Sequence, residues 1–186
     1  MITQDDMDDM RPTGNLIALT GPAGCGKSKV ADMMVEDGWV RVKFASTLKA
    51  MCRAMGMSED MVEGDQKEVS HPTLGNQTPR YVMQTLGTEW GRKTIHPDLW
   101  VRITKAEIQR NLDDGRNVVV DDCRFANEAD CIHSLGGVVV GVSGRGGIVG
   151  QHESEAGLAP DYKIDNNGDL EQLRKNVLIF ARDIGL

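Results

Sequence analysis

The chain has 186 residues, enough for one domain with a continuous core and too few for two ordinary domains. Its formal net charge of −7 argues against broad nucleic-acid binding, and no apolar stretch approaches the roughly 18 residues of a membrane span. The four cysteines lack metal-ligand spacing, so we expect neither zinc nor a disulfide, and a reducing cytoplasm is the simplest setting.

Residues 1–13 form an acidic tail with four aspartates, where a signal peptide would need positive charge. We expect this tail to be disordered and residues 14–186 to form a single domain. The remaining sequence shows no internal repeat and no linker between domains.

A buried strand is predicted at Leu16-Ile17-Ala18-Leu19, and a glycine-rich loop follows it directly. The loop consists of Gly21, Pro22, Ala23, Gly24, Cys25, Gly26, Lys27 and Ser28, which fit the phosphate-binding pattern G-x-x-x-x-G-K-[ST]. Glycines let backbone N–H groups turn inward around a polyphosphate, Lys27 brings charge to the β- and γ-phosphates, and Ser28 offers its hydroxyl to Mg²⁺. The helix that follows directs its N-terminal dipole at the same anion. These features predict nucleotide binding.

Residues 39–44 predict a second strand, and residues 47–55 a helix with Lys49 and Arg53 on one face. Lys49 lies just beyond a strand end, so we favour contact with a ligand phosphate over a cation that merely faces solvent. Residues 58–77 are polar and lack periodicity, which predicts a loop or lid near the substrate rather than core.

Another helix is predicted to begin at Thr78 and Pro79, as N-cap and first-turn residue. Helical spacing gives it two faces. Residues free to bind would be Arg80, Gln84 and Gly87, and residues that pack would be Val82, Leu86 and Trp90.

A helix is next predicted over residues 97–112, and then a third strand over residues 117–120 that ends in Asp121 and Asp122. Carboxylates at the carboxyl end of a parallel strand face the phosphate loop, where they can hold Mg²⁺ or its waters and order a nearby arginine. This is the expected form of a Walker B strand, and the alternative is a turn that simply ends the strand.

Two further strands are predicted at residues 137–142 and 162–164, followed by a last helix that Asp169 and Gln172 cap. Its expected buried stripe is Leu170, Leu173, Val177 and Ala181. Strands and helices alternate throughout, which predicts an α/β fold with a parallel five-stranded sheet and helices on both faces.

From Arg80 to Thr88 the chain resembles the phage deoxynucleoside monophosphate kinases, and further segments continue the resemblance in the same order. These segments are Trp100-Val101, residues 119–124 with Glu128 and Asp130, and residues 152–158 leading to residues 164–168. The resemblance implies a P-loop NTPase fold like that of nucleoside monophosphate kinases, over residues 14–186. It also implies a substrate-binding region at about residues 46–100 and a short lid at about residues 143–157.

The activity implied by the resemblance is transfer of the ATP γ-phosphoryl group to a deoxynucleoside monophosphate, with Mg²⁺ bound by Ser28 and Asp122. The catalytic cations would be Lys27, Arg124 and Arg145, the last on the glycine-rich lid or else idle in an exposed turn. The implied acceptor site comprises Lys49, Arg80, Gln84, Gly87, Thr88, Trp100, Asp122, Arg124 and Glu128. Trp100 would stack on the base and Gln84 would reach its edge, unless Trp100 is a core aromatic.

Two alternatives remain open. One is a related P-loop kinase that acts on dephospho-coenzyme A or a ribonucleotide, and the other is a P-loop ATPase or switch that acts on a macromolecule. The sequence contains no N-K-x-D guanine-reading motif. The resemblance further suggests small-molecule substrates, a homodimer and a cytoplasmic setting, which is the host cytoplasm if the source is viral.

Overall fold

The structure is a computed structural model that describes residues 14–144 and 158–186. The chain divides into two compact units, one formed by Met1–Lys43 with Lys105–Leu186 and the other by Phe44–Thr104. We call the first the sheet unit and the second the helical unit.

A parallel sheet of five strands forms the sheet unit, in the order β2-β3-β1-β4-β5. Its strands are β1 (Leu16–Thr20), β2 (Val40–Val42), β3 (Val118–Val120), β4 (Val138–Gly144) and β5 (Tyr162–Asn166). The central β1 pairs Ala18 with Val120 on one side and with Val139 on the other. All five carboxyl ends therefore lie along one edge, and the predicted α/β class with a parallel five-stranded sheet is confirmed.

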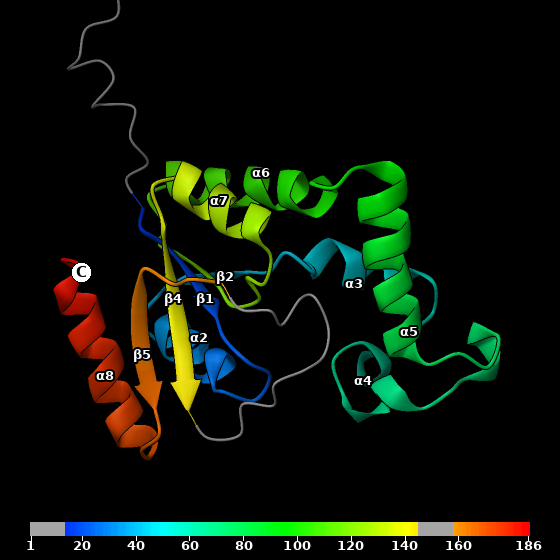
Figure 1. The fold of residues 1–186 in the computed structure, drawn as a ribbon, viewed down its shortest axis with the longest axis horizontal. Coiled ribbons are helices and arrows are strands. Elements are labelled where there is room, and N and C mark those ends of the chain that lie inside the picture. Colours follow the sequence, from blue (N-terminus) through cyan, green and yellow to red (C-terminus); the bar gives the residue numbers. More distant parts are fainter. Residues whose placement is uncertain (1–13, 145–157) are drawn as a thin grey trace, which may run out of the picture. The chain divides into compact units, whose positions relative to one another are not determined.

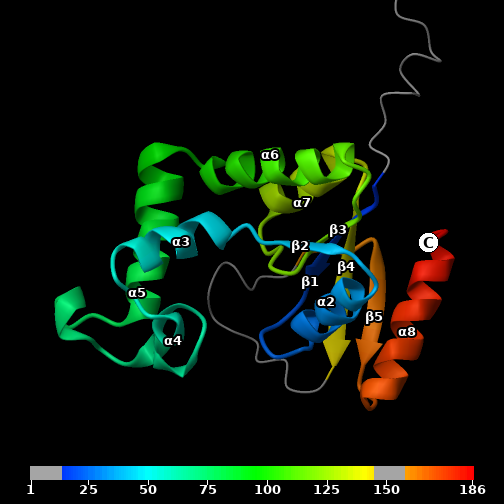
Figure 2. The ribbon, with the colours of Figure 1, turned by 180° about the vertical axis from the view of Figure 1, so that it is seen from behind.

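Helices pack on both faces because successive strand residues point to opposite sides of the sheet. Ile17 and Leu19 belong to a buried cluster completed by α2 (Lys27–Glu36) and α8 (Leu170–Asp183), and α8 lies along β5 (Figures 1 and 2). The opposite face meets α7 (Ala126–Ser134) and residues 105–113 of α6 (Leu99–Asp113), where Ile132 is fully buried. None of the helices within the described residues has the length and apolar composition of a membrane span.

Two details of the sheet unit differ from prediction. Helix α7 was not anticipated. In α8 the buried stripe is Leu173, Val177 and Phe180, whereas Leu170 is 55% exposed. Phe180 completes the stripe because its ring packs edge-on against Tyr162, at a centroid distance of 5.6 Å.

The helical unit consists of short helices around a small core of its own. Its elements are α3 (Ser46–Ala54), α4 (Glu59–Val62), 3₁₀-helices η1 (Asp65–Glu68) and η2 (Pro72–Leu74), α5 (Pro79–Gln84), the π-helix η3 (Thr85–Ile95) and the start of α6. The buried residues of this core are Leu48, Cys52, Met57, Met61, Val62 and Trp100.

The helical unit corrects two expectations. Residues 58–77 were expected to lie outside the core, but they form short helices and bury Met61 and Val62. Thr78 does cap α5, accepting a hydrogen bond from the Tyr81 N–H at 3.1 Å. The helix then widens into η3, which changes the spacing of its faces, and Trp90 is 41% exposed instead of packed.

Candidate active site

The glycine-rich loop joins β1 to α2 at the carboxyl edge of the sheet. Helix α2 begins at Lys27, directly after Gly26, and the Gly26 carbonyl accepts hydrogen bonds from the N–H groups of Lys29 and Val30 at 3.0 and 3.1 Å. The loop therefore ends at a helix N-terminus, where free N–H groups and the helix dipole favour an anion.

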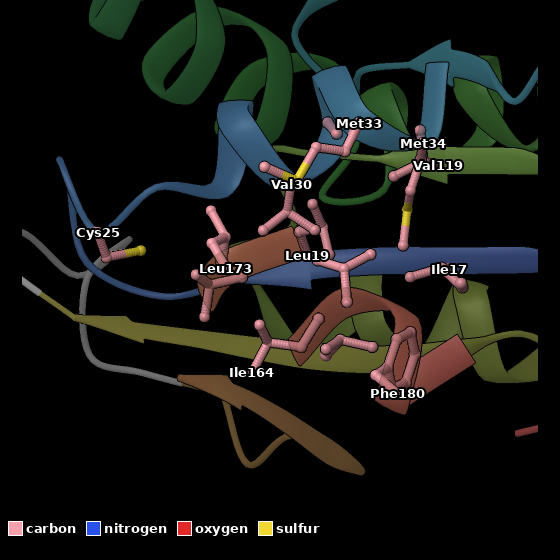
Figure 3. Packing of buried hydrophobic residues seen from close by; sticks show 14 residues of the cluster. Ile17, Leu19, Cys25, Val30, Met33, Met34, Val119, Ile164, Leu173 and Phe180 are labelled. Carbon is pink, nitrogen blue, oxygen red and sulfur yellow. The ribbon is translucent and has the colours of Figure 1, made fainter. Parts of the chain in front are cut away.

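Neighbouring strands hold the loop so closely that side chains are excluded from two of its positions. Gly26 has a φ of +108°, and a Cβ there would lie 2.2 Å from Asn166 Nδ2, which itself donates to the Cys25 carbonyl at 2.9 Å. A Cβ on Gly21 would lie 2.4 Å from the Val142 carbonyl oxygen. The ends of β4 and β5 thus fix the backbone of the loop, and the buried Cys25 side chain anchors it to the core cluster (Figure 3).

The ammonium group of Lys27 folds back over the loop. Its Nζ donates to the carbonyl oxygens of Gly21 and Pro22 at 2.6 and 2.7 Å and lies 3.7 Å from Cys25 Sγ. Ser28 in the first turn of α2 is exposed. Lys27 and Ser28 therefore provide an ammonium group and an exposed hydroxyl group from adjacent positions, as polyphosphate binding requires.

A cluster of charged residues surrounds the buried Asp121 between β3, β2 and α2. Asp121 follows β3 and is 5% exposed, and its Oδ2 lies 3.5 Å from Lys43 Nζ and 3.7 Å from Arg41 Nε. Arg41 Nη2 also donates to Asp32 Oδ1 at 2.6 Å and to the Ser28 carbonyl at 3.2 Å. Strand periodicity puts Arg41 and Lys43 on one face of β2, but sequence reasoning did not single out either of them.

The turn after β3 carries three of the residues implied by the resemblance. Asp122 is half-buried and Arg124 is exposed. Glu128 is 2% exposed, and its Oε2 accepts hydrogen bonds from the N–H groups of Arg124 and Phe125 at 2.8 and 3.2 Å. This carboxylate consequently fixes the backbone that carries Arg124. Burial, followed by the charges of Glu128 and Asp122, raises the pKa of the Cys123 thiol well above its usual range.

Three cations of the helical unit, Lys49, Arg53 and Arg80, are paired with carboxylates from residues 58–77. Lys49 Nζ contacts both carboxylate oxygens of Glu63 at 2.8 Å, and Arg80 pairs with Glu68. Arg53 shares the face of Lys49, as predicted, and donates to Glu59 at 2.8 and 2.9 Å. Lys49 and Arg80, two of the three cations proposed for the acceptor, therefore each have a carboxylate partner within their own unit.

Trp100 lies in the core of the helical unit. The residue is 4% exposed, and its Nε1 donates to the Gly87 carbonyl at 2.9 Å. Its indole packs against Gly91, where a Cβ would come within 2.6 Å, and lies 6.3 Å from the Trp90 ring. Too little of the ring is exposed to stack on a base, so the structure favours the alternative interpretation of Trp100 as a core aromatic. Gln84 is exposed, while Thr88 is half-buried.

The predicted residues are distributed over both units. Asp122, Arg124 and Glu128 belong to the sheet unit, and the acceptor-site residues from Lys49 to Trp100 belong to the helical unit. The proposed lid residues Arg145 and His152 lie outside the described residues.

Comparisons with known proteins identify related sequences and a related fold. A family model described as deoxynucleotide monophosphate kinase matches residues 55–177. A protein of Acanthamoeba polyphaga mimivirus that has been given the same name is 29% identical over 187 residues, which cover 88% of this chain and 94% of the viral protein. The deoxynucleoside-5′-monophosphate kinase of Escherichia phage T5 is 30% identical over 93 residues, covering 46% of this chain and 36% of the phage protein. The crystal structure of TT1252 from Thermus thermophilus shares the fold, with a TM-score of 0.55 at 17% identity over 93% of this chain and 99% of that one.

Proposed function

Because this chain belongs to the deoxynucleotide monophosphate kinase family, we propose that it transfers the γ-phosphoryl group of ATP to the 5′-phosphate of a deoxynucleoside monophosphate. In this reaction an acceptor phosphate oxygen bonds to the γ-phosphorus, and the bond to the β–γ bridging oxygen breaks. The products are ADP and a deoxynucleoside diphosphate. Since such a transfer needs little covalent chemistry from the protein, positioning and charge neutralisation are the tasks left to its side chains.

The observation that carries the proposal is the loop at the start of α2. Its backbone is fixed by β4 and β5, and the Lys27 ammonium lies 2.6 Å from the Gly21 carbonyl. In the proposed complex this ammonium leaves the loop carbonyls for the β- and γ-phosphates, while the first N–H groups of α2 bind phosphate oxygens. Exchange of neutral carbonyl acceptors for charged oxygens strengthens each hydrogen bond.

The residues beside the loop fit Mg²⁺ bound together with nucleotide phosphates. Within the described residues, no group of three or more His, Cys, Asp or Glu side chains could hold a metal ion unaided. Mg²⁺ commonly takes one or two protein ligands and completes its shell with phosphates and water. The Ser28 hydroxyl and the Asp122 carboxylate would supply such ligands, and Asp121 adds a buried carboxylate that sequence reasoning did not rank above Asp122. Bound there, the ion would neutralise charge on the transferred group.

The acceptor phosphate is assigned to three cations that the family resemblance implies. Lys49 and Arg80 would exchange Glu63 and Glu68 for phosphate oxygens, and Arg124 would approach from the turn that Glu128 holds. Gln84, Gly87 and Thr88 are assigned to the nucleoside. Trp100 would contribute to nucleoside binding only indirectly, because its Nε1–H group donates to the carbonyl of Gly87 and so positions that residue. Arg145 is retained as a candidate catalytic cation on the strength of the sequence.

The proposal is tested by ADP release from ATP and Mg²⁺, with each deoxynucleoside and ribonucleoside monophosphate offered separately and the diphosphate product identified by chromatography. Turnover that depends on a deoxynucleotide is the expected result, and the panel also reports the preferred base. Turnover confined to ribonucleotides or dephospho-coenzyme A would move the assignment to a related kinase. ADP release that responds only to DNA or a protein would contradict it.

The setting of the enzyme is also proposed from its relatives. We expect a cytoplasmic protein whose substrates are small molecules, and the viral and phage relatives make a host cytoplasm the natural location. Light scattering of the purified chain would test the homodimer that the family resemblance suggested.

A further inference from the structure

Arg41 is the residue that connects the start of α2 with the carboxylate at the end of β3. We propose that Arg41 is a positioning residue, which holds Asp121 in register with Ser28 and so couples nucleotide binding to Mg²⁺. This inference rests on the proposed function, and it adds a residue that neither the motifs nor the family resemblance singled out.

The contacts of one guanidinium group carry the proposal. Nη2 donates to the Ser28 carbonyl at 3.2 Å and to Asp32 Oδ1 at 2.6 Å, so its hydrogen bonds reach both of the first two turns of α2. Nε of the same group lies 3.7 Å from Asp121 Oδ2. All of these residues belong to the sheet unit. The planar guanidinium therefore hydrogen-bonds to α2 and faces Asp121 through a charge contact, an arrangement that the flexible stem and point charge of a lysine would reproduce less well.

Burial separates this cluster from an ordinary surface ion pair. The Asp121 side chain is 2% exposed and that of Arg41 is 25% exposed, although Asp32 on α2 is 45% exposed. By contrast, Arg174 Nη2 and Glu36 Oε2 form a 2.7 Å pair at the other end of α2 with 52% and 58% exposure. Exposed pairs contribute little, whereas breaking a buried pair leaves an uncompensated charge. Loss of Arg41 therefore affects a carboxylate shielded from water, whereas loss of Arg174 affects one that water can solvate.

The second oxygen of Asp121 points to a ligand. Asp121 Oδ1 and Arg41 Nε are buried atoms with no hydrogen-bond partner among the described residues. A buried carboxylate oxygen without a donor costs free energy, and proteins rarely keep one unless something else supplies the donor. Asp121 would hold Mg²⁺ through a metal-bound water that supplies this missing donor when nucleotide binds, while the charges of Arg41 and Lys43 lie beside Oδ2.

The charged groups that face Asp121 come from β2 and its end, and Lys29 adds a weaker contact to Asp32 at 3.9 Å. Removing Arg41 leaves Lys43, already slightly nearer at 3.5 Å, as the remaining cation in contact with Asp121 among the described residues. The carboxylate is then neutralised by one flexible ammonium, and the carbonyl of Ser28 loses a donor. We therefore expect Mg²⁺ coupling to weaken even if the domain folds.

The test compares nucleotide affinity with and without Mg²⁺, using calorimetric titration of ATP into the full chain in Mg²⁺ or in EDTA. No acceptor is present, so the result does not depend on which monophosphate is phosphorylated. In Arg41→Gln the gain in affinity that Mg²⁺ gives the wild type should fall about tenfold, the usual size for loss of an outer-shell partner, while the affinity in EDTA stays within twofold. Arg41→Lys should recover part of the gain.

Arg174→Gln is the matched control. It breaks an arginine–carboxylate pair whose carboxylate, Glu36, also lies on α2, and it should leave the gain in affinity from Mg²⁺ unchanged. An unchanged gain in Arg41→Gln, or an equal fall in the control, would overturn the proposal. If Arg41→Gln does not fold, Arg41→Lys and Asp32→Asn decide in its place, since each weakens one contact of the guanidinium. A wild type whose ATP affinity does not depend on Mg²⁺ would also overturn the proposal. The proposed kinase activity would not be affected by that result, because the panel of acceptor monophosphates tests it separately.

Discussion

The close fit of the phosphate loop against β5 makes Gly26→Ala a demanding perturbation. Gly26 has a φ of +108°, which costs an alanine about 1–2 kcal/mol. The new Cβ would lie 2.2 Å from Asn166 Nδ2, so the amide must move and give up its 2.9 Å hydrogen bond to the Cys25 carbonyl, a further loss of about 1 kcal/mol. The expected fall in unfolding free energy is therefore about 2–3 kcal/mol.

Urea unfolding followed by circular dichroism measures this loss, and two companion variants divide it into its causes. Gly38→Ala, at a φ of +89° with nothing within 4 Å of the new Cβ, should show the backbone cost alone. Asn166→Ala should show the hydrogen bond alone. The double variant Gly26→Ala with Asn166→Ala should be about as stable as Gly26→Ala, because the first substitution already displaces the amide. Full additivity, or a Gly26→Ala protein as stable as wild type, would refute the reasoning.

Three further predictions follow from single contacts. Lys27→Ala should lower kcat/KM about 100-fold or more while thermal unfolding stays close to wild type, and activity within a few-fold would refute its role. Trp100→Phe removes the bond to Gly87 and should lower the unfolding free energy by about 1 kcal/mol with an unchanged acceptor KM, whereas a tenfold rise in KM at full stability would support base stacking. The hydrogen bond from the Val139 N–H holds the pKa of Asp161 below its ordinary value. The stability that this bond gives the folded protein is complete above the unfolded pKa of about 3.9 and is lost as the pH falls through the lower folded pKa. Asp161→Asn should therefore flatten the acid-induced fall in unfolding free energy below about pH 4, and an unaltered slope would contradict this.

Local sequence signals predicted the parts of the site that one segment builds. The run from Leu16 to Ser28 encodes strand, loop and helix start in consecutive residues, and the structure forms them in that order. The parallel sheet could likewise be predicted, because β1, β3 and β4 are short, mainly apolar runs bounded by turn residues.

Features that depend on distant residues escaped prediction. The role of Arg41 arises from the pairing of β2 with β3, which sets Val42 opposite Val120 and so brings Arg41 to Asp121. The residue spacing within β2 or β3 does not predict which strands lie next to each other in the sheet. Trp100 was ambiguous for a similar reason, because only the fold of residues 44–104 decides whether its ring is covered. Helix α7 was missed because its polar sequence hides a narrow buried stripe.

Magnitudes explain how a chain with a net charge of −7 can bind anionic substrates. The Arg80–Glu68 pair is half-exposed on both sides, and such pairs contribute about 0–1 kcal/mol. Arg80 therefore loses little free energy when it exchanges Glu68 for a substrate phosphate, which carries more negative charge than a carboxylate. The Lys49–Glu63 contact is less exposed, so Lys49 exchanges its carboxylate partner less readily. The two carboxylates thus keep Lys49 and Arg80 ordered at small cost. In the proposed acceptor site, a phosphate must compete more strongly with Glu63 for Lys49 than with Glu68 for Arg80.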